Sequence, residues 1–231
     1  MKNFNENLVK GESQNNMHFN FTDYSEVKGC ELKNSDYFNA IKIESRLNNL
    51  NVTVSKNGGV YVEARLHGRS KCPEGITFDA YVDKRVLHIV AYFKPGMDKG
   101  DVTLEVTVPQ KVWSSFYIIS NKSNINLEGI EAERIEIVNV EGDTEVRDAT
   151  YKLGMFTTLT GWLELITKAQ DCSETKLLTI SGEVLAQFLN VGEIEFDLKE
   201  AQGSFYNCHV DEDGYEAKVS IRSVSGTVLI G

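Results

Sequence analysis

One acidic segment of the sequence, Asp211-Glu212-Asp213-Gly214, could in principle bind a metal ion. In a calcium loop, alternating carboxylates ligate the ion and a glycine permits the sharp turn. Asp211 and Asp213 have that alternation and are the only candidate metal ligands, but the further ligands and the distal glutamate of such a loop are missing. We interpret the segment as an acidic turn, and the sequence predicts neither a metal site nor a cofactor.

Other reactive side chains do not form a catalytic motif. Cys208 and His209 are adjacent, but neighbours on a strand point to opposite faces, which keeps a thiol and an imidazole apart. Glu193, Glu195 and Asp197 alternate with apolar residues and are expected to line one exposed strand face, where charge discourages edge pairing. A glycosidase needs two carboxylates roughly 5 to 10 Å apart, and no local motif selects such a pair. The sequence therefore assigns no catalytic residue and predicts that the protein is not an enzyme.

The cysteines are scattered, with no C-x-x-C spacing that would indicate a zinc ribbon or a thioredoxin-like motif. They are Cys30, Cys72, Cys172 and Cys208. Buried free thiols are the expected state of all of them. Cys30 and Cys72 form the only pair that we consider for a disulfide.

The charge of the chain is acidic, because Lys+Arg 24 against Asp+Glu 34 gives a net charge of -10. No basic stripe could neutralise phosphates, so neither nucleic acid nor an anionic membrane surface is an expected partner. No segment approaches the roughly 20 apolar residues of a membrane helix, and residues 1–16 lack the apolar run of a secretory signal. We expect a cytoplasmic location for this sequence, and a cell-surface location only if a native leader was removed.

The first half of the chain reads as an arm followed by short strands. Residues 1–36 are polar with isolated aromatic side chains, and we expect an N-terminal arm that lies on the body of the protein. Residues 37–110 alternate apolar and polar side chains, which predicts an antiparallel β region. Asn57-Gly58-Gly59 is predicted to be the turn of one hairpin, and Asp83-Lys84 the two-residue turn of the next. Val102 to Pro109 forms the clearest strand of the sequence and must stop or reach an edge at the proline.

Residues 111–231 repeat a unit of one β-rich stretch, a turn and a second short strand. The predicted turn positions recur about every 20 residues; they are Asn124, Gly142, Gly161, Gly182, Gly203 and Gly226. One unit is too short to bury its own apolar face, so neighbouring units must stack about 4.8 Å apart and share a core. Leu153 to Ile166 also fits a helical face but is assigned to strand. The whole pattern predicts an all-β protein in which a sandwich-like antiparallel region leads into a β-solenoid, the two forming one continuous body.

Three motifs carry a resemblance to a known family. They are V-x-L-x-V-x-V-P at residues 102–109, Ile180-Ser181-Gly182-Glu183-Val184, and V-S-G-x-V-x-I at residues 224–230. Over roughly residues 38–231 the chain resembles the bacterial putative-adhesin family of β-strand-repeat proteins, a domain of unknown function. The resemblance implies an all-β, solenoid-like bacterial protein with no established activity, and it transfers no catalytic residue. The turns at 121–123 and 161–162 lack the family's Ser-Gly pair, and no leader or anchor is visible ahead of the domain, which argues against surface display.

Three classes of function fit these observations. The favoured one is a non-catalytic binding or adhesion-like module for an unknown protein or carbohydrate ligand, which predicts an exposed apolar or aromatic patch on one face. The alternatives are a self-assembling scaffold resembling the bactofilins, with unblocked ends, and a polysaccharide-active β-solenoid enzyme, with converging carboxylates in a cleft. Residues 219–230 reach almost to the end of the chain, so the sequence offers no later segment to cap the solenoid. Either the N-terminal arm folds back over that end or two chains pack end to end, and we favour the homodimer.

Overall fold

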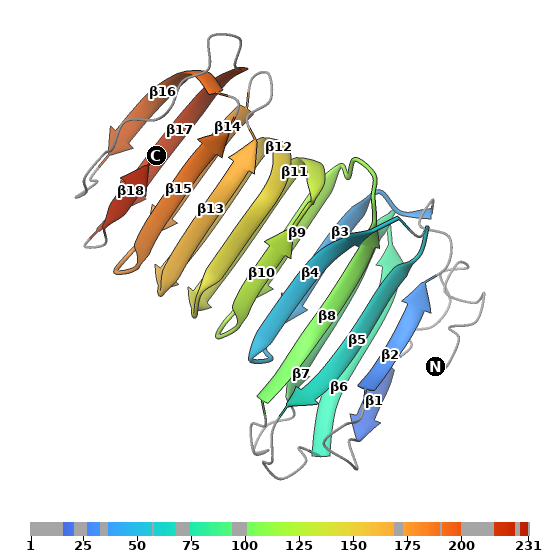
Figure 1. Cartoon of the computed structure of the whole chain (residues 1–231). Helices are drawn as coiled ribbons and strands as arrows, with labels where there is room; N and C mark the ends of the chain where they lie inside the picture. Colours follow the sequence, from blue (N-terminus) through green and yellow to red (C-terminus); the bar gives the residue numbers. More distant parts are fainter. Residues whose placement is uncertain are drawn as a thin grey trace.

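Strands stack into two layers that face each other along the whole molecule (Figure 1). The computed structural model describes residues 16–20, 27–32, 37–56, 58–67, 74–93, 101–168, 173–189, 191–199, 215–224 and 227–230. None of these residues lies in an α-helix, and none forms a helix with the length and apolar character needed to cross a bilayer. The 18 strands form one hydrogen-bonded sheet, because the long strand β12 (Thr144–Thr160) begins in one layer and ends in the other.

Each layer has its own order of strands, counted from the N-terminal end of the stack. Layer A contains β1 (Asn16–Asn20), β6 (Glu74–Asp83), β7 (Val86–Phe93), β3 (Ala40–Ser45), β9 (Ser115–Ser120), β11 (Glu131–Glu141), the second half of β12, β14 (Ser173–Thr179), β17 (Tyr215–Ser223) and β16 (Val191–Lys199). Layer B contains β2 (Val27–Leu32), β5 (Val60–His67), β8 (Asp101–Pro109), β4 (Asn49–Ser55), β10 (Asn124–Glu128), the first half of β12, β13 (Trp162–Lys168), β15 (Glu183–Leu189) and β18 (Val228–Ile230).

The repeat region stacks in parallel, as a solenoid must. In layer A, β9, β11, β12, β14 and β17 pair in parallel in that order, and β10, β12, β13 and β15 do the same in layer B. The all-β, solenoid-like prediction is therefore confirmed. The strand assignment over Leu153 to Ile166 is also confirmed, because that segment is divided between β12 and β13.

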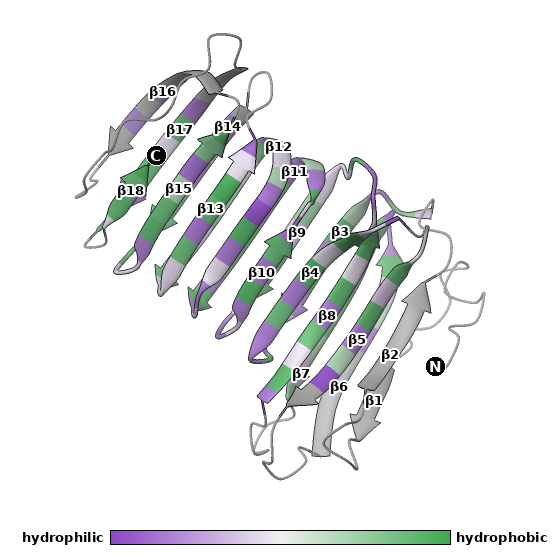
Figure 2. Cartoon of the chain, viewed as in Figure 1, coloured by the Kyte–Doolittle hydropathy of each residue, from purple (hydrophilic) through white to green (hydrophobic). Residues whose placement is uncertain are grey.

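A single apolar core fills the space between the layers. Hydropathy alternates along the strands that are coloured in Figure 2, so every second side chain of these strands points inward. Phe116 and Ile118 of β9 show the pattern, with 0% of each side chain exposed. Trp113 closes the core at a turn, where it stacks on Phe38 with ring centroids 5.9 Å apart. Burial of apolar surface at about 25 cal/mol per Å² is what holds the layers together.

A column of buried polar side chains runs through the corner at which the chain turns from layer A to layer B. Its members pair in register along the stack and are at most 1% exposed; they are Ser45, Ser120, Asn139, Thr158, Thr179 and Ser223. Ser120 Oγ accepts a hydrogen bond from the Ser123 amide at 3.0 Å, and Thr179 Oγ1 accepts one from the Gly182 amide at 2.9 Å. These side chains satisfy backbone groups that a buried bend would otherwise leave without partners. We call this column the corner column.

The glycines of the turns also stack directly on one another. A methyl group on Gly161 would lie 2.4 Å from the carbonyl oxygen of Gly142, and one on Gly182 would lie 2.4 Å from that of Gly161. We call each repeat unit of the solenoid a rung. No side chain fits at such distances, so the turns of successive rungs need glycine in order to lie as close together as their strands do. The turn positions at Gly142, Gly161 and Gly182 are thereby confirmed, whereas Gly203 and Gly226 lie outside the described residues.

The predicted hairpin around Asn57-Gly58-Gly59 is wrong. β4 and β5 do not pair with each other, because β8 lies between them, parallel to β4 and antiparallel to β5. β8 buries Leu104, Val106 and Val108 and accepts a neighbour on each side. Alternation along a segment identifies a strand but not its partner, and here a strand from later in the chain takes the central position.

The turn between β6 and β7 lies one residue later than predicted. Asp83 pairs with Val86, so the two-residue turn is Lys84-Arg85 and not Asp83-Lys84. Both turn residues have positive φ, 48° and 67°. A two-residue turn of this kind matches the twist of the strands that it joins, even though neither position holds the preferred glycine or asparagine.

The last rungs also differ from the prediction. β14 pairs with β17 and β15 pairs with β18 directly, so the last rung stacks on the rung of Gly182 with no rung around Gly203 between them. The strand β16 instead pairs with the far side of β17 and forms the end of layer A. A spacing of about 20 residues cannot distinguish a rung from an excursion of equal length. The C-terminal end of layer A therefore has a covering strand that the sequence did not indicate.

Candidate functional site

Amide and carboxylate side chains form a row across the outer face of layer B. Alternation turns every second residue of these strands away from the core, and the strand register brings the outward residues into line. The row consists of Glu105, Asn51, Asn126, Glu145 and Glu164. Its members lie on strands about 4.8 Å apart. We call it the amide–carboxylate row.

A second row begins at the corner and ends at an exposed tryptophan. Asn124 Oδ1 accepts a hydrogen bond from the Asp143 amide at 3.1 Å, and Asp143 Oδ1 accepts one from the Trp162 amide at 3.0 Å. Each bond joins one rung to the next, 19 residues along the chain. The backbone of Trp162 is thus fixed, while 44% of the residue surface remains exposed.

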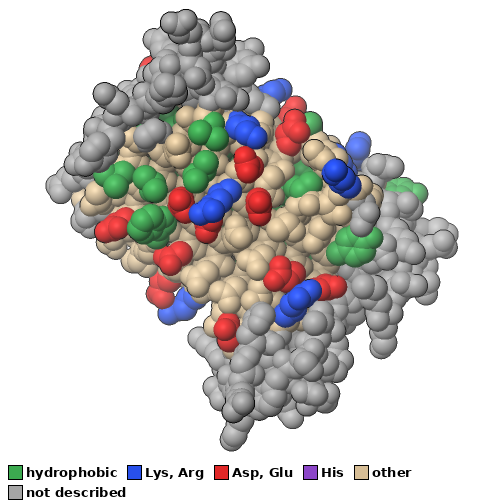
Figure 3. All heavy atoms as spheres, in the orientation of Figure 1, with side chains coloured by type: hydrophobic (Ala, Val, Ile, Leu, Met, Phe, Trp, Pro, Cys, Tyr) green, Lys and Arg blue, Asp and Glu red, His purple; other side chains and the backbone are tan. Residues whose placement is uncertain are grey.

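An open hollow of about 430 Å³ lies where the two rows meet. The residues of its lining that could contact a ligand through polar or aromatic groups include Asn49, Asn124, Asn126, Glu145, Trp162 and Glu164. Figure 3 shows this face of the molecule, on which acidic groups lie close to a few basic ones and hydrophobic side chains gather toward the C-terminal end of the stack. The combination of an aromatic side chain with several convergent polar groups is typical of ligand sites.

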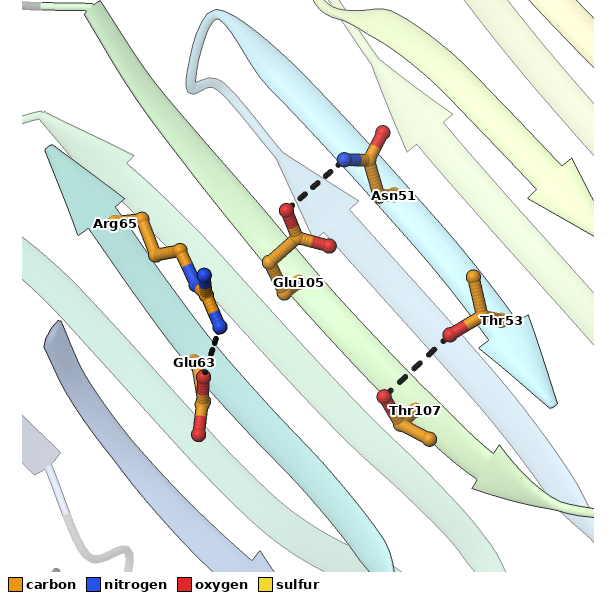
Figure 4. Close-up of polar contacts among 6 residues, drawn as sticks. All are labelled: Asn51, Thr53, Glu63, Arg65, Glu105 and Thr107. Carbon is orange, nitrogen blue, oxygen red and sulfur yellow. Dashed lines mark hydrogen bonds and ion pairs between the residues drawn. The ribbon is translucent and has the colours of Figure 1, made fainter. Parts of the chain in front are cut away.

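Hydrogen bonds hold most of the amide groups in place. Asn51 Nδ2 donates to Glu105 Oε1 at 3.0 Å (Figure 4), and Asn49 Nδ2 donates to Asp101 Oδ1 at 3.0 Å. Asn124 Nδ2 donates to Asn49 Oδ1 at 3.3 Å. This network places the polar groups of the hollow before any ligand arrives, which lowers the entropic cost of binding.

Asn126 differs from the other asparagines of the hollow. It is partly buried, and its Oδ1 has no hydrogen-bond partner in the part of the chain that the structure describes. A buried polar atom without a partner costs free energy, about 1 to 3 kcal/mol. Rotation about χ2 can present either the oxygen or the nitrogen of this amide to the hollow, because that torsion has a broad energy profile. Asn126 therefore retains hydrogen-bonding capacity that a ligand can use.

The electrostatic character of the hollow is negative. Glu145 and Glu164 both form ion pairs with Arg147, the bond to Glu164 being 3.2 Å long. The hydrogen bond to Glu164 and the charge of Glu145 raise the pKa of Arg147. Other carboxylates of the same face, Asp101 and Asp143, have no ion pair with a basic side chain among the described residues.

The two adjacent glutamates do not form a catalytic pair. Glu145 and Glu164 are neighbours in register on parallel strands, point the same way and share one arginine. A glycosidase instead holds two carboxyl groups on opposite sides of the scissile bond. The described residues also contain no group of three or more His, Cys, Asp or Glu side chains that could hold a metal ion.

The described residues that line this hollow include none of the candidate site residues singled out from the sequence. Asp211, Asp213 and the pair Cys208-His209 fall outside the described residues, so no geometry tests them. Of the three acidic residues in β16, Glu195 is exposed and accepts an ion pair from Lys218 at 3.5 Å. The backbone of Cys30 lies in β2 opposite Val62, and the other cysteines lie outside the described residues.

The residues that line the hollow were not among the site residues predicted from the sequence. Asn124, Asp143 and Trp162 recur at 19-residue intervals, at or just after the predicted turns, so the repeat itself carried the signal. Alignment of the repeats on Gly142 and Gly161 places Asp143 and Trp162 at equivalent positions. Only the stacking of the rungs brings Asn124, Asp143 and Trp162 into contact.

Among solved structures, several bacterial proteins share the general arrangement at low identity. A putative cell adhesion protein from Clostridium sporogenes is 8% identical with a TM-score of 0.45, over 89% of this chain and 98% of that chain. A putative adhesin from Bacteroides fragilis is 10% identical with a TM-score of 0.38, over 89% and 97%. A putative lipid binding protein from Parabacteroides distasonis is 12% identical with a TM-score of 0.37, over 89% and 96%.

No curated protein matches the chain in sequence. The pattern of the family described as Toastrack DUF4097, in contrast, matches residues 38–230. The match covers the repeats and also residues 38–110, where β3 and β4 each pair in parallel with their neighbours and do not form the purely antiparallel region that was predicted. It agrees with the resemblance carried by the Ser-Gly turns. The chain belongs to the Toastrack DUF4097 family.

Proposed function

We propose that this protein is a non-catalytic binding module that takes its ligand on the outer face of layer B. The observation that carries the proposal is the hollow, in which an exposed Trp162 lies beside a prearranged set of amides and carboxylates. Exposed aromatic residues with convergent polar groups mark binding sites more often than they mark ordinary surface. The carboxylates of the same hollow lie side by side and lack the opposed arrangement that catalysis of glycoside cleavage requires.

An NMR screen over several classes of ligand tests this proposal. The uniformly ¹⁵N-labelled full chain is mixed with peptides, small polar metabolites and oligosaccharides in separate pools. We expect at least one pool to shift amide resonances of β10, β12 and β13, including that of Trp162. Binding that maps only to layer A, or no shift on layer B with any pool, would contradict the proposal.

A second candidate function is self-association through the outer face of layer A. It rests on an apolar patch on the outer face of layer A, formed by Leu178, Ile180 and Val224, which are 38%, 44% and 62% exposed. Charged residues on the same layer form ion pairs within the layer, such as Arg134 with Glu136 and Lys176 with Glu174. Two identical copies could therefore meet at this face without net repulsion, although the whole chain has a charge of -10.

Light scattering separates this second candidate from a monomeric binding module. If the patch joins two copies, the full chain has the mass of a dimer at micromolar concentration and Ile180→Lys returns it to a monomer. The matched control is Val112→Lys, because Val112 is 58% exposed at a turn before β9 and lies outside the patch. A monomeric mass for the unmodified chain at high micromolar concentration excludes the patch as a self-association surface.

A further inference from the structure

We infer that the hollow beside Trp162 binds a neutral oligosaccharide, an inference that rests on the proposed binding function and names its ligand class. A sugar ring presents apolar C–H groups on its faces and hydroxyl groups around its edge. The hollow offers a partner for each, an indole at one end and a row of amides and carboxylates beside it. An amphipathic ligand of this kind matches an aromatic side chain that is open to solvent.

The backbone that carries the indole is fixed, and the indole is open to solvent. Trp162 begins β13, its amide is bonded to Asp143 Oδ1 at 3.0 Å, and its neighbour Leu163 is 1% exposed in the core. Because the backbone is fixed on both sides, stacking against the indole costs little conformational entropy. Trp113, the other tryptophan of the chain, is only 1% exposed and cannot contact a ligand.

The polar groups suit hydroxyls in particular. A hydroxyl both donates and accepts, so it can satisfy a carboxylate oxygen of Glu164 and an amide nitrogen in the same site. Asn126 supplies an amide whose oxygen has no partner among the described residues. The side chains of Glu145 and Glu164 are 38% and 23% exposed, so their remaining lone pairs are within reach.

The charge of the hollow selects against acidic ligands. Glu145 and Glu164 already share Arg147, and Asp143 lines the same hollow. A sulfate, phosphate or uronic acid would meet this excess of negative charge at close range, where each like-charge pair costs about 1 kcal/mol or more. Neutral sugars meet no such cost, so charge decides the ligand class where shape alone does not.

The shape of the hollow favours a chain of sugars over a single one. It is open and extends across the strands from β8 to β13, so its polar groups recur at about 4.8 Å, a distance similar to the width of one sugar ring. An open site buries less of its ligand than a closed pocket does. We therefore expect weak binding, with affinity increasing as sugar units are added.

Titration of the full chain with three hexasaccharides tests the inference. The probes are β-1,4-linked glucose, β-1,4-linked N-acetylglucosamine and, as the acidic counterpart, α-1,4-linked galacturonic acid. We expect at least one neutral probe to shift the Trp162 indole resonance and to quench its fluorescence, whereas the acidic probe at equal concentration does neither. Equal binding of the acidic probe, or no effect of either neutral probe, overturns the inference.

Three variants connect the binding to the hollow. Trp162→Ala is expected to weaken binding at least tenfold, Trp162→Phe less than that, and Asn126→Ala severalfold, while Tyr37→Ala, at an exposed aromatic outside the hollow, leaves it unchanged. The side chain of Trp162 is exposed, so these variants fold, and circular dichroism checks this. If the neutral probes fail but another class of ligand shifts the hollow in the NMR screen, the sugar inference is wrong and the proposed function stands. If no ligand of any class shifts the hollow, both are wrong.

Discussion

The imidazole of His88 lies flat against the phenol ring of Tyr81, with ring centroids 4.7 Å apart and planes 2° apart. The two residues are opposite each other on β7 and β6, on the outer face of layer A. On the other side, His88 is in register with Lys42 of β3. Partial burial and then the positive charge of Lys42 lower the pKa of His88, and the carboxylates of Asp83 and Glu44 oppose this shift less strongly.

The pKa of His88 is expected to lie below 6.5 when measured by NMR. Lys42→Met should raise the pKa of His88, because the positive charge is removed while the burial remains. Lys122→Met should leave this pKa unchanged, because Lys122 is not in register with His88. The folded protein holds this imidazole neutral, so the unfolded chain takes up a proton first as the pH falls below 6.5. Stability due to His88 is therefore fully present above pH 6.5 and decreases below it, and His88→Phe should remove that part of the pH dependence. A pKa at or above 6.5 contradicts the assignment.

Tyr151 is expected to make stability fall at high pH. Its side chain is buried between the layers and its hydroxyl is 2.9 Å from Thr175 Oγ1. Burial raises the pKa of Tyr151 to about 12, against which the hydrogen bonds to Thr175 and Thr167 act weakly. Because the unfolded tyrosine ionises near pH 10, the folded state loses stability from about pH 10 to 12, by about 1.4 kcal/mol per pH unit.

Tyr151→Phe separates these two effects. At pH 8 the variant should be about 1 kcal/mol less stable, because Thr175 loses its partner. Above pH 11 it should be the more stable protein, since it has no buried phenol to ionise. Urea unfolding at both pH values measures the difference, and Tyr37→Phe at an exposed site should stay within about 0.5 kcal/mol of the unmodified protein at pH 8. The absence of a crossover would show that Tyr151 is not held neutral by burial.

Gly161→Ala is expected to destabilise the protein by about 3 kcal/mol or more. The new methyl group would lie 2.4 Å from the Gly142 carbonyl oxygen, and the φ of 117° is one that alanine rarely adopts. Gly58→Ala is the matched control, because nothing lies within 4 Å of its added carbon, and its effect should be close to zero. Thermal unfolding compares the two. Similar melting temperatures for both variants would mean that the glycines do not stack as described.

Asn139→Asp tests the corner column. Asn139 Nδ2 donates to the carbonyl oxygens of Ser123 at 2.9 Å and Gly142 at 3.1 Å. In the variant, a carboxylate oxygen would face these two carbonyl oxygens in a buried site, where none of the three can donate a hydrogen bond. We expect the free energy of unfolding to fall by about 3 to 5 kcal/mol. Burial would raise the pKa of the new carboxyl group, so protonation should recover part of the stability as the pH falls toward 5. Asn121→Asp, on the exposed side of the same corner, should cost less than about 0.5 kcal/mol at any of these pH values.

The sequence predicted those features of the fold that depend on the pattern within one segment. Alternation predicted the strands, and glycines that recur about every 20 residues predicted the turns at Gly142, Gly161 and Gly182. Pairing was harder, because the place of β8 between β4 and β5 depends on contacts between segments about 50 residues apart. The same holds for β16, which has the alternation of a rung but pairs outside the last one.

The candidate site could not be predicted, for a related reason. Asn126, Glu145 and Glu164 are unremarkable polar residues on separate strands, and each alone reads as a solvated position. They become neighbours because successive rungs pair in register. Motifs within single segments do not predict that register. The acidic turn at residues 211–214 attracted attention because it is contiguous, and it lies outside the described residues.

The stacking of the rungs also has a mechanical consequence. β2 and β18 lie at opposite ends of layer B, so tension between them acts along the stack and nearly parallel to the hydrogen bonds between strands (Figure 1). Bonds loaded in that direction open one strand pair at a time, without the simultaneous rupture that sliding strands would require. Each rung that peels away frees about 20 residues, or roughly 70 Å of extended chain. Under load the molecule would therefore lengthen in steps while the remaining rungs stay folded.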